Sequence, residues 1–210
     1  MQYLEPMNFL GHAYLSFGHP EILVGNMISD FVKGKTQYQY PEDIQKGIKL
    51  HRLIDDYTDR HPATLAAKEF FRPAYRLYSA PIVDVVYDHF LASDEQTLTD
   101  QELSELAQNT YNILDQFHYL LPSPLVAMLP YMKRDNWLYN YKSEQGIYRS
   151  LQGLMRRASI TDDGSKALAV LLANKADLGI QYRHMIADVK HFAKGAFEEL
   201  IDPAKSLPNN

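Results

Sequence analysis

Apolar residues recur at helical spacing along most of the chain, and segments with the alternating pattern of a β-strand are scarce. No linker, internal repeat or low-complexity segment divides the sequence. The pattern predicts an all-α fold, a single-domain helical bundle of about seven to nine helices over residues 1–210. The tail, 203–210, is expected to fray. Prolines stand where a first helical turn can begin, at Pro41, Pro62, Pro81 and Pro124.

The segment 41–60 shows the clearest amphipathic pattern. Wound as a helix at about 100° per residue, it gathers its aliphatic residues on one face and places Arg52 and Asp56 on the other. His51 and Asp55 fall inside the apolar face, one turn apart. A carboxylate is costly to bury unless it is paired or bound to a metal. The pattern leaves two interpretations, a structural hydrogen bond between His51 and Asp55 or a metal site.

A second segment, 80–92, favours the metal. It is apolar nearly all round, so we expect a buried helix, yet it contains Asp84, Asp88 and His89. Asp84 and Asp88 are four residues apart and share one face of that helix. Two buried helices that both carry acids need a common compensating charge, which a divalent cation supplies most simply.

Further groups of the same kind stand in apolar surroundings at His12 and Asp30. His12 alone is more typical of a hydrogen-bonded core histidine than of a metal ligand. Together with the residues above, it completes a set of nitrogen and oxygen donors without thiolates, which suits Mn²⁺, Fe²⁺ or Mg²⁺, admits Zn²⁺ and disfavours Cu⁺. No phosphate-binding glycine loop, nucleophile elbow or His-Glu-x-x-His motif is present. The residues therefore indicate metal-assisted hydrolysis.

The composition excludes several kinds of site and partner. The chain has no cysteine, which rules out disulfides, Cys-based zinc sites and cysteine nucleophiles. No apolar run reaches the length of a membrane span and no signal peptide is recognisable, so we expect a cytoplasmic protein. A net charge of -5 at pH 7 argues against a general nucleic-acid binder.

The charge is unevenly distributed. Residues 131–160 contain six basic and two acidic residues, which gives a local charge of +4. An acidic partner would find a complementary surface there, although a solvated helix face would have the same composition. The basic residues of this segment are Lys133, Arg134, Lys142, Arg149, Arg156 and Arg157.

Five motifs stand in order along the chain: MNFLGHAYLSF (7–17), GNMISDFVKGK (25–35), GIKLHRLIDDYTDRHP (47–62), VVYDHFLA (85–92) and MLPYMKRDNWLYNY (128–141). Together they resemble the acyl carrier protein phosphodiesterase family, which is considered a divergent branch of the HD-type metal phosphohydrolases. The similarity extends from Met7 to about Arg157, and the order of the third and fourth motifs is its most specific feature. The resemblance implies an HD-like helical fold and makes residues 1–6 an N-terminal extension.

Members of this family are enzymes that use a divalent metal, typically Mn²⁺. They hydrolyse the phosphodiester between 4′-phosphopantetheine and a serine of holo-acyl carrier protein, which yields apo-acyl carrier protein and free 4′-phosphopantetheine. By position, the resemblance implies that the metal ligands are Asp30, His51, Asp55 and Asp88. The residues that it makes further ligands or proton carriers are His12, His61 and His89.

Contacts to the substrate follow from the same resemblance. Arg52 and Lys33 would contact a phosphate oxygen, although the helical pattern puts Arg52 on the outer face. Acyl carrier proteins are small, acidic and helical, so we expect the basic segment to dock them. The residues of that segment expected to bind the substrate are Arg149, Arg156 and Arg157.

The sequence departs from the family pattern near the expected site. Ser29 replaces the glycine that usually precedes Asp30, no tryptophan follows the DHFLA motif, and the adjacent pair reads Asp88-His89 where HD enzymes have the histidine first. Two other functions therefore stay open. One is an HD-like hydrolase of nucleotides or other small phosphoesters, and the other is a non-enzymatic helical module that binds an acidic partner without a metal.

Overall fold

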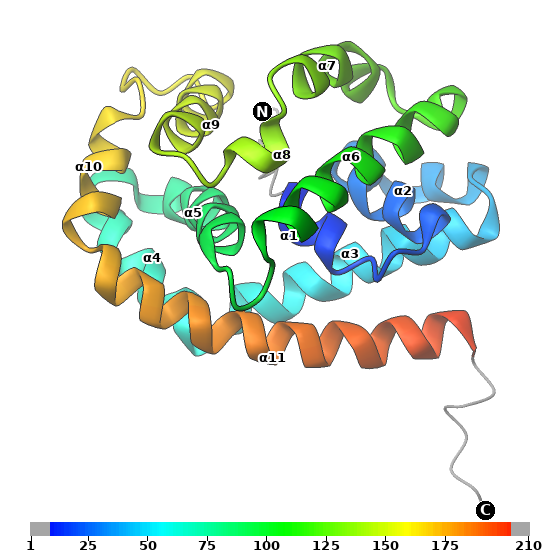
Figure 1. Cartoon of the computed structure of the whole chain (residues 1–210), viewed down its shortest axis with the longest axis horizontal. Coiled ribbons are helices and arrows are strands. Elements are labelled where there is room, and N and C mark those ends of the chain that lie inside the picture. The colour runs from blue at the N-terminus through cyan, green and yellow to red at the C-terminus, as the bar shows by residue number, and fades with distance from the viewer. Residues whose placement is uncertain (1–8, 203–210) are drawn as a thin grey trace, which may run out of the picture.

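The computed structural model describes residues 9–202, which are almost entirely helical (Figure 1). The α-helices are α1 (Phe9–Tyr14), α2 (Pro20–Ile28), α3 (Glu42–Arg60), α4 (Pro62–Tyr75), α5 (Ser79–Ser93), α6 (Asp100–Gln116), α7 (Ser123–Arg134), α8 (Trp137–Asn140), α9 (Glu144–Arg157), α10 (Ser165–Ala173) and α11 (Lys175–Ile201). Short 3₁₀ helices connect some of them: η1 (Ser29–Phe31), η2 (Gly34–Gln39), η3 (Arg76–Tyr78) and η4 (His118–Leu120).

The predicted all-α class is confirmed, since the described residues form eleven α-helices and no strand. A few more helices are present than expected, because α1, α8 and α10 have only six, four and nine residues and are too short to show a full apolar period. Residues 1–6 and 203–210, expected to be an extension and a frayed tail, lie outside the described part of the chain. The relation to HD-type enzymes stays a prediction. Within residues 9–202, no helix is both long and apolar enough to cross a membrane.

Helices α2 and α3 approach each other through two glycines. A β-carbon on Gly47 of α3 would lie 2.3 Å from the backbone oxygen of Ile22, and one on Gly25 of α2 would lie 2.2 Å from the backbone oxygen of Ile44. A side chain at either position would collide with the opposite backbone, so glycine is required for this contact. The close approach brings the end of α2, and the η1 turn that follows it, beside the middle of α3.

The longest helix, α11, supports α3 from another side. Its 27 residues span about 40 Å, and it contacts α3, α4, α5 and α10. Figure 1 shows it running along one edge of the molecule, below α3, α4 and α5. Tyr57 of α3 stacks on Phe192 of α11 with ring centres 4.3 Å apart. Helix α3 is thus packed against both α2 and α11, which fixes the direction of its inward face.

Helix α5 passes through the interior, as the apolar segment 80–92 predicts. Eleven of its fifteen residues are buried, and it contacts α1, α4, α8, α9 and α11. Helices α7, α8 and α9 lie on the side of the molecule opposite α11 (Figure 1). Helix α5 thus contacts both α1, which carries His12, and helices α8 and α9 of the basic segment.

Candidate active site

His12, His51 and Asp55 form a compact cluster. His12 of α1 and His51 of α3 stack with their ring centres 3.9 Å apart. Asp55, one turn after His51, contacts both rings: its Oδ1 lies 3.1 Å from His12 Nε2 and its Oδ2 lies 3.0 Å from His51 Nε2. Asp30 of η1 adds a second carboxylate, 2.9 Å from His51 Nε2. The inward direction predicted for His51 and Asp55 is confirmed, because both side chains point toward groups from other elements.

Asn26 of α2 orients both histidines. Its backbone carbonyl accepts a hydrogen bond from His51 Nδ1 at 2.8 Å, so this nitrogen carries a hydrogen. Its side-chain nitrogen donates to Ser16 Oγ and to the carbonyl of His12, which turns the amide oxygen toward His12 Nδ1 at 2.9 Å. Both Nδ1 atoms are thus engaged and both Nε2 atoms face Asp55. Metal-binding histidines are held by outer hydrogen bonds of this kind.

The electrostatics of the cluster call for a positive charge at its centre. Burial disfavours the charged form of His51, but the carboxylates of Asp55 and Asp30 outweigh it and raise the pKa of His51 to about 10. Burial also opposes the ionisation of Asp55, yet His51 and His12 hold the pKa of Asp55 well below its usual range. The carboxylates are therefore compensated by a proton on His51 here, and a cation at the same place would do so equally well.

The donor atoms fit a divalent metal ion. One ligand atom each from His12, His51 and Asp55 lies within 4.8 Å of the others. His12 Nε2 is buried and lies 3.1 Å from Asp55 Oδ1. A buried ring nitrogen beside a carboxylate is suited to coordinate a cation together with it.

Two carboxylates of α5 lie near this cluster, and the structure uses them differently. Asp88, for which the sequence predicts metal binding, accepts hydrogen bonds from the backbone nitrogens of Gly11 and Leu10, at 2.8 and 3.1 Å. Its carboxylate thereby accepts from backbone N–H groups in the first turn of α1, which have no partner within the helix. Burial raises the pKa of Asp88 to about 7. Asp84 makes no hydrogen bond or ion pair with another described residue and lines the cavity beside the cluster. Burial and the nearby Asp55 raise the pKa of Asp84 well above its usual range.

The cavity beside the cluster has a volume of about 400 Å³. Its walls include Asp30, His51, Asp55 and Asp84, so the cluster opens onto a space that a small ligand group can enter. With Asp59, five acidic or imidazole groups from η1, α3 and α5 line it. Asp84 was expected to be a buried acid on the same face as Asp88, but it was not among the predicted metal ligands or catalytic residues.

Two basic residues predicted to contact phosphate also line this cavity. The side chain of Arg52 extends from the outer face of α3 toward the cavity. Its guanidinium donates to the carbonyl of Val32 at 3.0 Å and to Gln37 Oε1 at 2.7 Å. These bonds fix it against the chain that follows η1. Burial and the charge of Arg52 lower the pKa of Lys33. The cavity therefore combines acidic groups with two cationic side chains.

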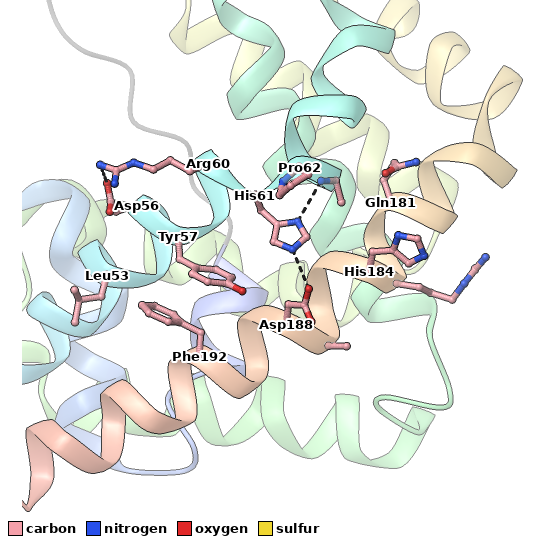
Figure 2. A pocket seen from close by; sticks show the side chains of 13 residues that line it. Leu53, Asp56, Tyr57, Arg60, His61, Pro62, Gln181, His184, Asp188 and Phe192 are labelled. Carbon is pink, nitrogen blue, oxygen red and sulfur yellow. Dashed lines mark hydrogen bonds and ion pairs between the residues drawn. The ribbon is translucent and has the colours of Figure 1, made fainter. Parts of the chain in front are cut away.

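His61 lies in a different place from the cluster. It precedes α4, where its Nδ1 accepts a hydrogen bond from the backbone nitrogen of Ala63 at 3.2 Å. Figure 2 shows its ring directed at Asp188 of α11, and its Nε2 lies 3.1 Å from Asp188 Oδ2. His61 lines a separate open groove of about 900 Å³ between α3, α4 and α11, together with His184 and Phe192. It connects helices and does not line the cavity that holds the cluster.

His89 also points away from the cluster. Its Nδ1 donates to the carbonyl of Tyr141, at the end of α8, at 2.7 Å. Burial lowers its pKa, which leaves the ring neutral. His89 therefore connects α5 to α8 and lines none of the walls of the 400 Å³ cavity.

The basic residues of the segment 131–160 that were expected to bind the substrate lie on α9. Arg149 and Arg156 are exposed, whereas Arg157 is partly buried. All three line a third cavity, between α7, α8 and α9. That cavity shares no lining residue with the cavity beside the cluster.

Replacing Asn26 by leucine, a residue of similar size, is expected to weaken Mn²⁺ binding about 10- to 100-fold. The substitution removes the amide that holds the ring of His12, while the backbone bond to His51 is retained. Calorimetric titration measures the affinity. Ser16→Ala, which removes only the hydroxyl bonded to Asn26, is the matched control and should bind Mn²⁺ nearly as well as the wild type. Equal affinity of Asn26→Leu and the wild type would contradict the orienting role.

Comparison with known proteins places the chain in a family. The family model for acyl carrier protein phosphodiesterase matches residues 7–189. The acyl carrier protein phosphodiesterase of Shigella boydii serotype 4 is 31% identical over 194 residues, which cover 89% of this chain and 100% of the relative. The proteins of that name from Photorhabdus laumondii and Yersinia pestis are 31% and 33% identical over 152 residues, 72% of this chain and 77% and 79% of theirs. No solved structure is detectably similar. The chain therefore belongs to the acyl carrier protein phosphodiesterase family.

Proposed function

We propose that this protein hydrolyses the phosphodiester that joins 4′-phosphopantetheine to a serine of holo-acyl carrier protein. The products would be apo-acyl carrier protein and free 4′-phosphopantetheine. The observation that carries the proposal is the His12–His51–Asp55 cluster at a cavity that also contains two cationic side chains. Relatives named for this activity, matched over most of the chain, support the choice of substrate.

Asp30, His51, Asp55 and His12 would hold the metal. Their donors are nitrogen and oxygen, which favours Mn²⁺, with Fe²⁺ and Mg²⁺ as alternatives. Such a cation, when bound, acidifies a water ligand and offsets the charge that develops on the phosphoryl oxygens. Asn26 keeps both Nε2 atoms directed at the ion position, so the ligands need no rearrangement before binding.

The remaining side chains of the cavity would act on the phosphodiester. Arg52 and Lys33 would bind its non-bridging oxygens through charge-assisted hydrogen bonds. Asp84 would accept a proton from the attacking water, because it faces the cavity and no described residue engages its carboxylate. His61 and His89 have no part in this scheme, since neither lines the cavity.

Docking of the acidic carrier protein would use the exposed arginines of α9. Reversing two of these charges, in Arg149→Glu/Arg156→Glu, is expected to raise KM for the carrier protein about tenfold and leave kcat nearly unchanged. Steady-state kinetics in low salt measures both. Lys166→Glu/Lys190→Glu reverses two exposed charges on α10 and α11 and serves as the control. An unchanged KM in the α9 variant, or an equal rise in the control, would contradict docking at α9.

The proposed reaction is tested by mass spectrometry of holo-acyl carrier protein incubated with the enzyme and Mn²⁺. We expect conversion to the mass of the apo-protein with release of 4′-phosphopantetheine, and no conversion in EDTA. A panel of nucleotides and small phosphodiesters, run in parallel, distinguishes the alternative hydrolase. Turnover of the panel without turnover of the carrier protein would overturn the proposed substrate, and inactivity of the folded, Mn²⁺-loaded protein toward both would overturn the proposed reaction.

A further inference from the structure

The cavity enclosed by α7, α8 and α9 has the character of a ligand site. Its volume is about 670 Å³, within the usual range for sites that enclose a small molecule. The helices α7, α8 and α9 that line it lie on the side of the molecule opposite α11 (Figure 1), and the cavity shares no lining residue with the candidate active site. Its apolar walls are formed by Phe9, Val85, Pro124, Ala127, Met128, Tyr131, Trp137 and Tyr141.

Arginines supply most of the charge of this cavity. Arg134 is neutralised, because it forms two hydrogen bonds of 2.8 Å with the carboxylate of Asp135, which also lines the cavity. Arg149, Arg156 and Arg157 form no ion pair with any residue in the described range 9–202. The cavity therefore has an excess of positive charge that no residue within 9–202 compensates by an ion pair.

Arg157 is more buried than Arg149 and Arg156. Its Nε is buried and makes no hydrogen bond to a described residue. Burial, together with the like charge of Arg156, lowers the pKa of Arg157, and Tyr141 offsets part of that effect. A buried guanidinium N–H without a hydrogen-bond partner is costly. An anionic group in the cavity would remove that cost and gain strong charge-assisted hydrogen bonds.

Gly153 of α9 leaves space at the wall of the cavity, whereas Gly146 is required by its close contact with the backbone of Asn140. Gly146, Ser150 and Gly153 line the cavity at spacings of four and three residues, so they form one strip along the helix between the arginines. A β-carbon on Gly153 would meet only the end of the Arg157 side chain, at 3.2 Å. Glycine costs about 1 kcal/mol in a helix interior relative to alanine. No backbone contact requires Gly153, and the space above it is consistent with a ligand.

From these observations we infer that this cavity binds a small amphipathic anion, a ligand with an aliphatic or aromatic body and one phosphate or carboxylate group. The body would lie on Trp137, Met128 and the neighbouring apolar wall, and the anionic group would pair with Arg157 and Arg156. The site goes beyond the proposed function, because it is separate from the His12–His51–Asp55 cluster and needs no metal. It shares Arg149 and Arg156 with the docking surface proposed for the carrier protein.

The single tryptophan of the chain makes binding directly measurable. Trp137 lines the cavity, so its fluorescence reports on the occupant. Full-length protein in EDTA is titrated with decyl phosphate below its micelle concentration, and separately with sodium decanoate, decanol and inorganic phosphate. We expect a saturable change with decyl phosphate or decanoate, and the comparison of these two identifies the preferred anionic group. Decanol and inorganic phosphate should each bind at least about tenfold more weakly than the preferred anion.

Two pairs of variants test the location. Gly153→Leu fills the cavity and should abolish binding, while Gly195→Leu, at a glycine of α11 with no atom within 4 Å of the added β-carbon, should bind as the wild type does. Arg157→Gln should weaken binding about tenfold or more. The exposed Arg183→Gln, outside this cavity, should have no effect. Melting temperatures confirm that each variant is folded.

The proposal would be overturned if neither decyl phosphate nor decanoate changed the fluorescence of folded wild-type protein up to the solubility limit. Equal binding by wild type and folded Gly153→Leu would also overturn it, because the ligand would then lie elsewhere. Binding of decanol as tight as that of decyl phosphate would show a purely apolar cavity and contradict the role of Arg157. None of these readings depends on catalytic activity, so failure here leaves the proposed function untouched.

Discussion

Asp55→Asn is expected to reduce turnover of the carrier protein by more than about a hundredfold. Loss of a residue that only orients a metal ligand typically costs about 10- to 100-fold, so a larger loss indicates a ligand. The substitution keeps the shape of the side chain but removes the charge that faces both His12 Nε2 and His51 Nε2. Affinity for Mn²⁺ should fall with the activity, because no other carboxylate in the described part of the chain contacts both rings. Single-turnover mass spectrometry and calorimetric Mn²⁺ titration measure the two effects.

The neighbouring residue provides the control. Asp56 is exposed on the outer face of α3 and pairs with Arg60, so Asp56→Asn changes the same chemical group one position away. We expect its turnover and Mn²⁺ affinity to stay within about twofold of the wild type, since a surface ion pair contributes little. Loss of activity in both variants, or in neither, would show that the inward face of α3 is not the catalytic face.

The second large effect is expected at Gly47. Alanine is a better helix former than glycine, so Gly47→Ala would stabilise an isolated helix by about 1 kcal/mol. In the protein its β-carbon would lie 2.3 Å from the backbone oxygen of Ile22, and α2 and α3 would have to separate. We expect the free energy of unfolding to fall by about 2 kcal/mol or more, as measured by urea denaturation.

Gly195→Ala is the matched control for this substitution. Gly195 is exposed in α11, and nothing lies within 4 Å of an added β-carbon. The free energy of unfolding should rise by about 0.5–1 kcal/mol, so the two glycine variants should shift stability in opposite directions. A Gly47→Ala protein as stable as the wild type would contradict the close packing of α2 on α3, on which the positions of Asp30 and His51 depend.

Local periodicity was sufficient to predict the inward face of the site. A helical projection of α3 separates Asp55 from Asp56, and the structure places the first in the cluster and the second in solvent. The apolar segment around Asp84 is buried as predicted, because a helix that is apolar all round has no face to expose. Both results depend only on which residues of one helix share a face, and sequence contains that information.

The partners of each side chain could not be predicted in the same way. Asp84 and Asp88 share a face, but only the tertiary fold brings the first turn of α1 to Asp88, 77 residues from Gly11. His61 follows α3 closely in sequence, yet the chain turns at that point and directs the ring to Asp188 of α11. These assignments depend on contacts between distant elements, which periodicity within one helix does not encode.

The role of Asn26 in the site was not predicted from the sequence. Asn26 stands alone as a polar side chain in the buried apolar run of α2, and a buried polar group must be satisfied by hydrogen bonds. That rule indicates a partner without identifying it. The structure supplies the partners, His12 and His51, and thereby gives Asn26 its role in the site.

Anomalous diffraction from crystals of the protein grown with Mn²⁺ tests the central claim most directly. Data collected at the manganese absorption edge locate the ion without reference to activity. We expect a peak about 2.0–2.3 Å from His12 Nε2, His51 Nε2 and a carboxylate oxygen of Asp55, with Asp30 adjacent. A fully Mn²⁺-loaded crystal with no peak at this cluster, or with its ion bound elsewhere, would contradict the central claim.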